Sequence, residues 1–524
     1  MDAIELTLFN RRCQAVCDEM GAVLQRTAFS PNIKDRLDFS CAIFDIHGQL
    51  CAQAAHIPVH LGSMAYAMAD IVQKVEWQDG DMLIINDPYL GGTHLPDITL
   101  IAPIFFDKIL CAFVASRAHH ADIGASTPGS MPLANTLQEE GLIIPPTLFM
   151  QNNEIIHDTF DGILENINQP ENAAADFKSQ MSANFCGKRR LFELINNMTI
   201  KQFHIALEDL NHYAEILARS SLKEIPDGQY TFTDVMDDDG QGNQDILIKV
   251  TLDVNDGNIL ADFTGTASQV KGNINCPLSV AAAAVYYCFY CLMPPQTPAC
   301  AGSFRSIKLK APKGCLINAN YPAAVAAGNV ETSTRLVDVV LGALAKALPE
   351  KIPAASHGSM NNIAMGHHAM GANTTSLQWD YYETLAGGMG AGANGAGLSA
   401  VQTHMTNTLN TPIEVLEKYY PIRITRYAIR QNSGGKGRHD GGNGLIREYE
   451  FLQTTSVTLL TERRTHAPWG LSGGGQGQTG MNLINDIAIP AKSTNTLQKG
   501  DRLTICTAGG GAWGYPTLGN PGNE

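Results

Sequence analysis

The sequence lacks the features that define several large classes of protein. Only 17% of its 524 residues are charged and its formal net charge is −15, so it has few of the basic clusters with which proteins bind DNA, RNA or anionic membranes. Its 12 cysteines do not show the dense, regular spacing of a secreted disulfide scaffold. We therefore expect a protein that binds no nucleic acid and works in the reducing cytoplasm.

Segments that would direct the chain to a membrane are also missing. Residues 1–5 show no basic stretch that leads into an apolar one, so we expect no signal peptide. The longest apolar run, 280–293, lies between Pro277 and Pro294 and is shorter than the roughly 18 to 20 residues that span a bilayer. We expect this run to form a buried helix and the protein to have no membrane association.

Apolar residues make up 44% of the chain, and they alternate between helical and strand patterns along its length. This mixture predicts an α+β fold, with many layers of antiparallel hairpins and packed helices. We expect an N-terminal α+β subdomain with a metal loop over 1–150, a helical segment over 151–226, and a mixed C-terminal part with Gly-rich loops over 227–524. No repeat with a period of roughly 20 to 50 residues is present, which excludes a solenoid or a propeller.

Local periodicity assigns the main elements. A first helix begins after Asp2 and carries an apolar stripe to Leu24, and two more helices are expected over 175–198 and 201–223. Alternating apolar residues on either side of short polar turns predict antiparallel hairpins. The paired segments are 39–44 with 50–54, 98–106 with 109–116, and 246–254 with 259–263.

Motifs for nucleotide and redox chemistry are absent or weak. Residues 433–438 (SGGKGR) lack the spacing of a phosphate-binding P-loop, and neither a G-x-S-x-G elbow nor an H-E-x-x-H helix is found. The C-x-x-C at 288–291 lies inside the apolar helix, which indicates buried structural cysteines. The Gly-rich stretches 387–392, 472–475 and 509–511 are typical of loops or close packing.

Histidine and aspartate gather near the N-terminus, between positions 56 and 122. A turn at residues 107–108 would pair residues whose numbers sum to about 215, which places Asp97 opposite Ala118. The hairpin therefore brings side chains from both of its outer ends to one place. One end supplies the imidazole of His94 and the carboxylate of Asp97, and the other supplies a second imidazole from the segment that holds His119, His120 and Asp122.

Neutral imidazole and carboxylate ligands together suit a divalent ion such as Mn, Fe, Co or Zn, and three protein ligands leave positions open for water or substrate. The alternative is a set of hydrogen-bonded loop residues. His56 and His60 have the spacing of a helical metal pair, but Pro58 between them argues against a helix. We expect these two to orient other ligands or to pack as ordinary polar residues.

Several motifs closely resemble those of the hydantoinase B family, and together they cover essentially the whole chain. They are RTAFSPNIK at 26–34, DFSCA at 38–42, HIPVHLGSM at 56–64, NDPY at 86–89, GGTHLPD at 91–97, SRAHHADIG at 116–124, EG at 140–141, GNVETS at 328–333 and GGNG at 441–444.

The family includes the B-type components of hydantoinases, N-methylhydantoinases and oxoprolinases, and related components of acetone and acetophenone carboxylases. The resemblance implies a hetero-oligomer in which ATP is bound by a separate A-type subunit that phosphorylates the substrate, while the B-type chain completes the reaction. It also implies a metal held at His94, Asp97 and His119. Asp122 is a further candidate ligand, since it or His120 could replace or orient His119.

The function that follows as an expectation is the metal-assisted ring opening of a cyclic amide, after activation by an ATP-using partner. The metal would be Mn, Zn or Fe, and His120 or Glu140 would act as the general base. Two alternatives stay open. The chain could be a component of an ATP-dependent ketone carboxylase, or a scaffold that activates the ATPase subunit without chemistry of its own.

Overall fold

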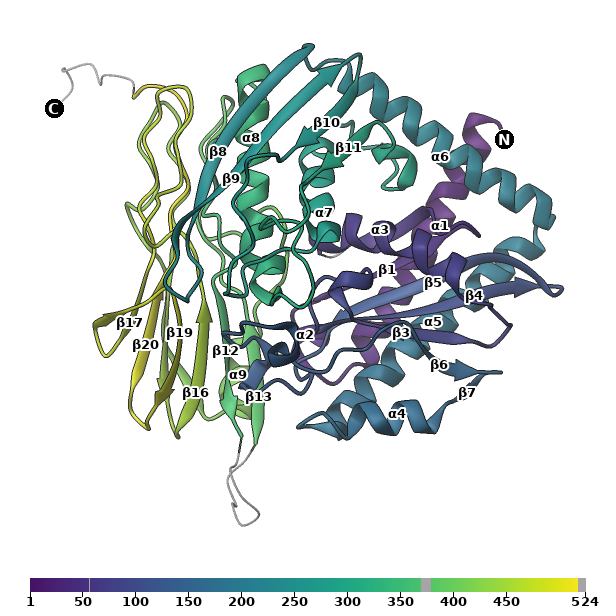
Figure 1. Ribbon diagram of the computed structural model, residues 1–524, viewed down its shortest axis with the longest axis horizontal. Coiled ribbons are helices and arrows are strands. Elements are labelled where there is room, and N and C mark those ends of the chain that lie inside the picture. Colours follow the sequence, from purple (N-terminus) through teal and green to yellow (C-terminus); the bar gives the residue numbers. More distant parts are fainter. Residues whose placement is uncertain (56, 369–377, 517–524) are drawn as a thin grey trace.

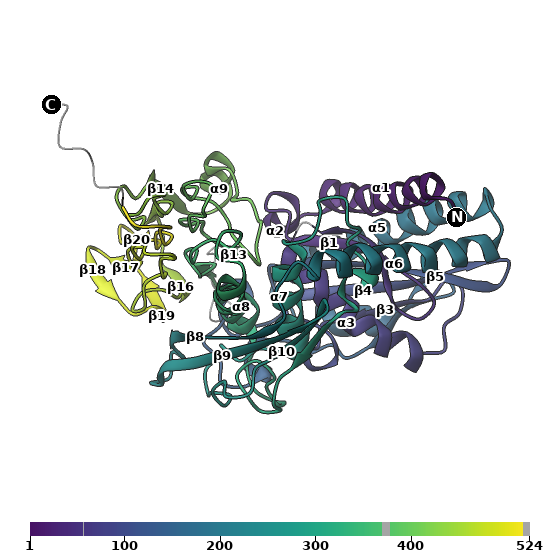
Figure 2. The ribbon, with the colours of Figure 1, turned by 90° about the horizontal axis from the view of Figure 1, so that it is seen from above.

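The computed structural model describes residues 1–55, 57–368 and 378–516 and has the α+β fold that the sequence predicts. Strand pairs, most of them antiparallel, form four sheets in this part of the chain. Figures 1 and 2 show an N-terminal sheet with long helices at one end of the molecule and C-terminal strands at the other, with further strands and helices between them.

The N-terminal sheet has seven strands in the order β2-β1-β5-β4-β3-β6-β7. It contains the hairpin on which the sequence places the candidate ligands. Its strands are β1 (Phe39–Phe44), β2 (Leu50–Ala55), β3 (Met82–Ile85), β4 (Asp97–Phe106), β5 (Ile109–His119), β6 (Thr147–Gln151) and β7 (Glu154–Ile155).

Helices cover both faces of this sheet, so its strands are buried on both sides. Because side chains alternate along a strand, Val114 of β5 packs into the core that contains α1 (Ala3–Thr27) and α5 (Pro170–Asn196), while Phe113 packs against α3 (Pro58–Lys74) on the other face. The α6 helix (Ile200–Leu222) joins the first core, and α2 (Pro31–Lys34) and α4 (His157–Leu164) are short.

The first helix is confirmed, and a second one corrects the sequence prediction. Asp2 accepts hydrogen bonds from the backbone of Ile4 and Glu5 and forms a capping box at the start of α1. No helix was expected around Pro58, but α3 begins at this residue. Proline is tolerated in the first turn because its missing N–H would have no partner there. His60 is therefore helical.

The register of the predicted hairpin differs from the expected one by a single residue. Asp97 pairs with His119 and Ile98 with Ala118, so the expectation that Asp97 lies opposite Ala118 is wrong. The cause is a bulge between Ile104 and Phe105, where the pairing register shifts. The shift places Asp97 and His119 directly opposite each other, on the same face of the sheet.

The middle of the chain packs a four-stranded sheet against two helices. The predicted hairpin over 246–254 and 259–263 is confirmed, and the apolar run at 280–293 forms a buried helix that ends at Tyr290. Cys288 is buried as expected, but the prediction is wrong for Cys291, which is exposed because it lies just past the end of the helix. The elements are β8 (Gly228–Asp238), β9 (Gln244–Asn255), β10 (Asn258–Asp262), β11 (Ile307–Lys310), α7 (Leu278–Tyr290) and α8 (Ser333–Ala347). None of the helices in the described part of the chain is long and apolar enough to cross a lipid bilayer.

The C-terminal part contains two sheets, with strand orders β13-β12-β16-β19 and β14-β15-β20-β17-β18. The Gly-rich stretches pack backbone against backbone: a Cβ on Gly441 would lie 2.0 Å from the carbonyl oxygen of Gly510. The elements are β12 (Asn362–His367), β13 (Trp379–Glu383), α9 (Ile413–Tyr419), β14 (Ile422–Ile429), β15 (Leu445–Phe451), β16 (Thr455–Leu460), β17 (Met481–Ile484), β18 (Ile487–Ile489), β19 (Lys492–Leu497) and β20 (Arg502–Cys506).

Candidate metal centre

Three of the predicted ligands meet at the end of the β4–β5 hairpin. His94 Nε2, Asp97 Oδ1 and His119 Nδ1 form a triangle in which each pair of atoms is 3.2 Å apart. All three side chains are buried, and they form the one group of potential metal ligands that converges in this way in the described ranges of the chain.

The size of this triangle fits a divalent ion. Ligand atoms that lie about 2.1 Å from one ion are about 3.0 Å apart at right angles and about 3.4 Å apart in a tetrahedron. The observed edge of 3.2 Å falls between these values. Two imidazoles and one carboxylate on one side of an ion leave its other positions open for water or substrate.

Hydrogen bonds alone explain the triangle less well. If both imidazole nitrogens donate to Asp97 Oδ1, two N–H groups oppose each other on the edge between His94 and His119. If only one donates, the lone pair of the other nitrogen faces the carboxylate at 3.2 Å. A divalent ion would instead accept one lone pair from each of the three atoms.

The loop that carries His94 is held in place by Asn86, at the end of β3. The Asn86 side chain donates to the carbonyl oxygens of Leu95 and Leu142, each at 2.9 Å, and accepts from the backbone N–H of Ile144 at 2.6 Å. A Cβ on Gly92 would lie 2.3 Å from the carbonyl oxygen of Asn86, so only glycine fits this close turn.

The second oxygen of Asp97 has its own set of partners. Oδ2 accepts a hydrogen bond from Thr93 Oγ1 at 2.5 Å, and it lies 3.4 Å from both His60 Nε2 and Asn329 Nδ2. The other nitrogen of the His60 ring is 3.0 Å from Ser40 Oγ. His60 on α3 thus lies beside Asp97 without joining the triangle, which agrees with the prediction that it packs as a supporting polar residue.

A buried arginine ties this face of the sheet together. Arg117 lies two residues before His119 on β5 and donates to Thr99 Oγ1 at 2.8 Å, to Ser63 Oγ of α3 at 2.7 Å and to the carbonyl oxygen of Gly91 at 3.2 Å. Burial lowers its pKa to about 10, so the guanidinium remains charged at neutral pH. It fastens α3 and the loop that carries His94 to the strand.

The protonation states also suit a cation. Burial works against the ionised form of Asp97, but His94 and His60 outweigh it and hold the pKa of this carboxyl well below its usual range. Burial lowers the pKa of His119, which favours the neutral imidazole. An ionised carboxylate, as at Asp97, and a neutral imidazole, as at His119, are forms that bind metal ions.

The profile of the hydantoinase B/oxoprolinase family matches residues 2–516, which is nearly the whole chain. This chain belongs to that family. The motifs at 91–97 and 116–124, which are among those that carry the resemblance, supply the triangle of His94, Asp97 and His119.

Two sequence relatives illustrate the range of lengths within the family. The chain is 36% identical to a 5-oxoprolinase of Dictyostelium discoideum over 98% of its own length, but it spans only 40% of that enzyme. It is 31% identical to the proposed B component of a D-/L-hydantoinase from Pseudomonas sp. strain NS671, covering 99% of this chain and 91% of that protein.

Two solved structures share the fold. The ATP-dependent caprolactamase from Pseudomonas jessenii superposes with a TM-score of 0.91 at 26% identity, covering 99% of this chain and 92% of that one. A nucleotide-free acetone carboxylase superposes with a TM-score of 0.87 over 98% of this chain and 76% of its own, at 16% identity, which is evidence for the fold alone.

The structure does not bring His120 and Asp122 into the triangle. The ring of His120 points to the α5 side of the sheet, where it contacts Phe177 and lies 2.9 Å from Gln180 Oε1. Asp122 accepts hydrogen bonds from the backbone of Gly124 and Gln169, at 2.9 and 2.7 Å. Both residues line a separate cavity of about 840 Å³ that also reaches β13 and α9.

Glu140 also lies away from the ligand atoms. Its Oε1 accepts the backbone N–H groups of Val325 and Ala326 at 2.8 and 2.7 Å, and its side chain is fully buried. Burial raises the pKa of Glu140 to about 8. In this position Glu140 joins the N-terminal part to the segment that precedes α8.

Spacing along the chain gives no indication of two other residues near Asp97. Asn329 comes from a π-helical turn (Gly328–Thr332) that lies more than 200 residues away in the sequence. Thr93 lies in the motif at 91–97, but its position in the sequence does not indicate that it binds Asp97. The π turn is a signal in the structure, since such turns are frequent at functional sites. His56, the other histidine considered from its spacing, lies outside the described residues.

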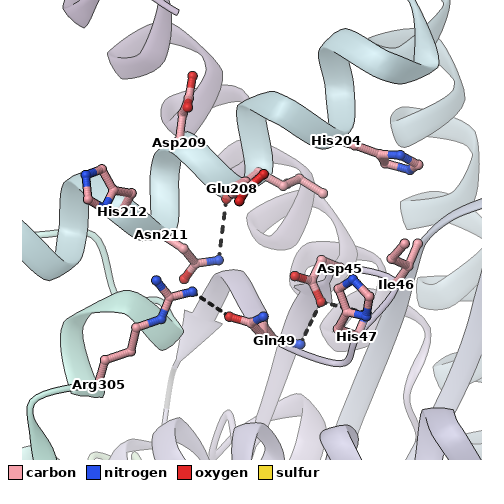
Figure 3. A pocket seen from close by; sticks show the side chains of 11 residues that line it. Asp45, Ile46, His47, Gln49, His204, Glu208, Asp209, Asn211, His212 and Arg305 are labelled. Atoms are coloured by element: carbon pink, nitrogen blue, oxygen red, sulfur yellow. Dashed lines mark hydrogen bonds between the residues drawn. The ribbon is translucent and has the colours of Figure 1, made fainter.

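A polar cleft of about 420 Å³ lies elsewhere, between the turn that joins β1 and β2 and one side of α6 (Figure 3). Arg305 donates to Gln49 Oε1 at 2.7 Å at its mouth, and His204 and His212 come from α6. Figure 3 shows these two histidines on opposite sides of the cleft, so they do not converge. The cleft shares no residue with the triangle.

Proposed function

We propose that this chain is the metal-binding catalytic component of an ATP-dependent cyclic-amide hydrolase of the hydantoinase and 5-oxoprolinase type. The observation that carries the proposal is the buried triangle of two imidazoles and one carboxylate, with edges of 3.2 Å. It is supported by similarity to a 5-oxoprolinase and to an ATP-dependent caprolactamase.

His94, Asp97 and His119 would hold the divalent ion, which we propose to be Mn, Zn or Fe. Such an ion activates water and polarises a carbonyl oxygen. Thr93 and His60 would orient the carboxylate of Asp97. Burial of the site keeps bulk water away, which strengthens its electrostatic interactions with a substrate.

ATP would be used by a separate A-type subunit in a hetero-oligomer. This chain has no P-loop sequence. The chain resembles, over 91% of that protein's length, a protein named as the proposed B component of a hydantoinase, and this similarity supports a second, A-type component. The A-type subunit would phosphorylate a small cyclic amide, and this chain would complete the cleavage of its C–N bond.

We assign no step to two of the sequence candidates. His120 faces α5 and Glu140 binds two backbone N–H groups, and neither is among the partners of the triangle. Asp122, proposed as a fourth ligand, is engaged by Gly124 and Gln169. A role for it would require a change of side-chain position.

Reconstitution with an A-type subunit tests the proposal. Wild-type protein and His94→Ala are combined with that subunit, ATP and divalent metal, and ring opening of 5-oxoproline, hydantoin and caprolactam is followed together with phosphate release. We expect wild type to open at least one ring and the variant to be inactive. Ring opening at the wild-type rate by His94→Ala would contradict the proposal.

Two further assays separate the alternatives. Bicarbonate-dependent consumption of acetone without any ring opening would support a carboxylase component, for which the present support is fold similarity alone. The chain is a scaffold if His94→Ala stimulates the ATPase of the A-type subunit to the same extent as wild type and also supports catalysis at the wild-type rate.

A further inference from the structure

The imidazole of His119 is held by its face rather than by its second nitrogen. Nδ1 points to the triangle, while Nε2 is buried and has no hydrogen-bond partner among the residues that the structure describes. A metal-binding histidine usually donates this second N–H to a carboxylate or a carbonyl group, which fixes the plane of the ring. Here the ring of Tyr382 lies nearly parallel to the imidazole, with an angle of 12° and 4.7 Å between centroids.

Tyr382 is in turn fixed by a short chain of hydrogen bonds. Its hydroxyl group donates to Asn362 Oδ1 at 2.6 Å, and Asn362 Nδ2 donates to Glu331 Oε1 at 2.7 Å and to the carbonyl oxygen of Leu460 at 3.0 Å. Because both acceptors lie on the Nδ2 side, the amide can only present its oxygen to the tyrosine. Tyr382, Asn362 and Glu331 are all buried.

The backbone of Tyr382 is held as well. Arg36, which follows α2, donates to the carbonyl oxygen of Tyr382 at 3.0 Å, and its guanidinium lies over the tyrosine ring at 4.8 Å from the centroid. The ring therefore has an anchored hydroxyl group, an anchored backbone and one face against His119. These restraints leave it little freedom to rotate away.

We infer that Tyr382 is a positioning residue of the candidate metal centre, which holds the His119 imidazole in its ligand orientation and is itself held by Asn362 and Glu331. The inference rests on the proposed metal centre. It adds that β12 and β13 of a C-terminal sheet set the geometry of a site whose ligands all come from the N-terminal sheet and its loop.

The adjacent Tyr381 provides a matched control. It lies on the same strand, is buried to the same extent at 1% exposure against 2% for Tyr382, and donates its hydroxyl group to Glu383 at 3.0 Å. Because side chains alternate along a strand, it points into a different core, away from His119. Removing either ring costs similar packing, but only one loss affects the metal ligand.

The experiment measures metal affinity by competition with a chelator, and the absorption spectrum of bound Co²⁺, which reports the coordination geometry. Tyr382→Leu and Tyr382→Phe are compared with Tyr381→Leu and Tyr381→Phe in the full chain. Loss of an outer partner of a ligand typically weakens metal affinity about 10- to 100-fold. We expect a loss in this range with an altered spectrum for Tyr382→Leu, a smaller loss for Tyr382→Phe, and neither change in the Tyr381 variants.

A double-mutant cycle tests the chain of hydrogen bonds. If Asn362 acts through the tyrosine hydroxyl group, Asn362→Ala in the Tyr382→Phe background should weaken metal binding no further. Additive losses would overturn the role of Asn362. Equal affinities and spectra for all the Tyr382 and Tyr381 variants would overturn the whole inference while leaving the proposed function intact. In this experiment, an absence of metal binding by wild type is the outcome that would count against that function.

Discussion

Two buried polar clusters lie in different regions of the molecule, and their charges are balanced in opposite ways. In the C-terminal part, Glu462 lies 2.6 Å from Lys492 Nζ and 3.0 Å from Arg335 Nη2, and all three side chains are fully buried. We call these residues the ion-pair cluster. In the triangle of His94, Asp97 and His119, the candidate metal site, a single carboxylate faces two imidazoles, and burial favours the neutral form of His119.

The difference separates structural support from a binding site. Each charge of the ion-pair cluster has an opposite charge within hydrogen-bonding distance, so this cluster needs nothing from outside the protein. In the triangle, three potential ligand atoms lie 3.2 Å from one another, and its three members include no permanent cation. Both clusters are equally buried, so burial alone would not distinguish them, whereas the balance of charge does.

The largest effect should come from removing the carboxylate of the triangle. We expect Asp97→Ala to weaken metal binding by at least about 100-fold, more than the loss of an outer partner, because it deletes a direct ligand. Isothermal titration calorimetry with Mn²⁺ and Zn²⁺ measures this. Asp122→Ala should bind within about tenfold of wild type. Equal losses in the two variants would show that Asp122 is also a ligand.

Breaking the ion-pair cluster should affect stability instead of metal binding. Glu462→Ala removes the shortest ion pair of both Lys492 and Arg335 and leaves these buried charges with longer contacts only, to Asp238 at 3.6 Å and to Asp234 at 3.7 Å. We expect a loss of up to about 3–5 kcal/mol in the free energy of unfolding. Urea denaturation measures it. Glu224→Ala, which removes the partner of Lys351 at the surface, should have a much smaller effect. If Glu462→Ala lowers metal content per folded chain while stability holds, the two clusters have been assigned the wrong roles.

Metal removal should destabilise the protein through the triangle only. An ion at about 100 times its Kd stabilises the folded state by about 2.7 kcal/mol, so chelation should lower the melting temperature of wild type. Asp97→Ala should not respond to the chelator, whereas Glu462→Gln should respond as wild type does. A response of Asp97→Ala as large as that of wild type would place the ion elsewhere.

Glu140 represents a third kind of buried carboxyl group, with neither an ion nor a salt bridge among the described residues. Its pKa is raised by burial from 4.5 to about 8, so the folded state holds its proton more tightly than the unfolded state does. The stabilising effect of that proton is complete below the unfolded pKa of 4.5 and is lost as the pH rises to about 8. The slope is at most about 1.4 kcal/mol per pH unit.

Glu140→Gln should remove this contribution and flatten the dependence of the melting temperature on pH, without changing metal affinity. Glutamine keeps an oxygen that can accept the two backbone N–H groups, which makes it the appropriate substitution. An unchanged pH dependence would mean that the pKa of Glu140 is not raised in the folded protein. Loss of metal binding would mean that it belongs to the site after all.

Much of the candidate site could be predicted from local sequence, because the hairpin keeps its ligands close along the chain. His94, Asp97 and His119 lie within 26 positions, and any register near the predicted one brings them together. The predicted pairing register of the hairpin was wrong by one residue, because nothing in the sequence marks the bulge between Ile104 and Phe105. His120 follows His119 directly, so the alternation of side chains along a strand could have indicated that it faces the other side, but Asp122 lies beyond the strand, where spacing gives no such indication.

The supporting residues could not be predicted in this way. Tyr382, Asn362 and Asn329 reach the site only through the packing of the C-terminal part against the N-terminal sheet. His60 depends on a helix that starts at Pro58, where the expectation that proline prevents a helix overlooked its tolerance in a first turn. Long-range packing carries no local periodicity that a single sequence would reveal.

The central claim is that the triangle of His94, Asp97 and His119 binds a divalent ion. Elemental analysis of the purified chain by inductively coupled plasma mass spectrometry, beside His94→Ala and Glu462→Gln, tests it most directly. We expect about one ion per chain in wild type and in Glu462→Gln, and none in His94→Ala. A wild-type chain without metal, even after incubation with manganese, iron and zinc salts, would contradict the claim.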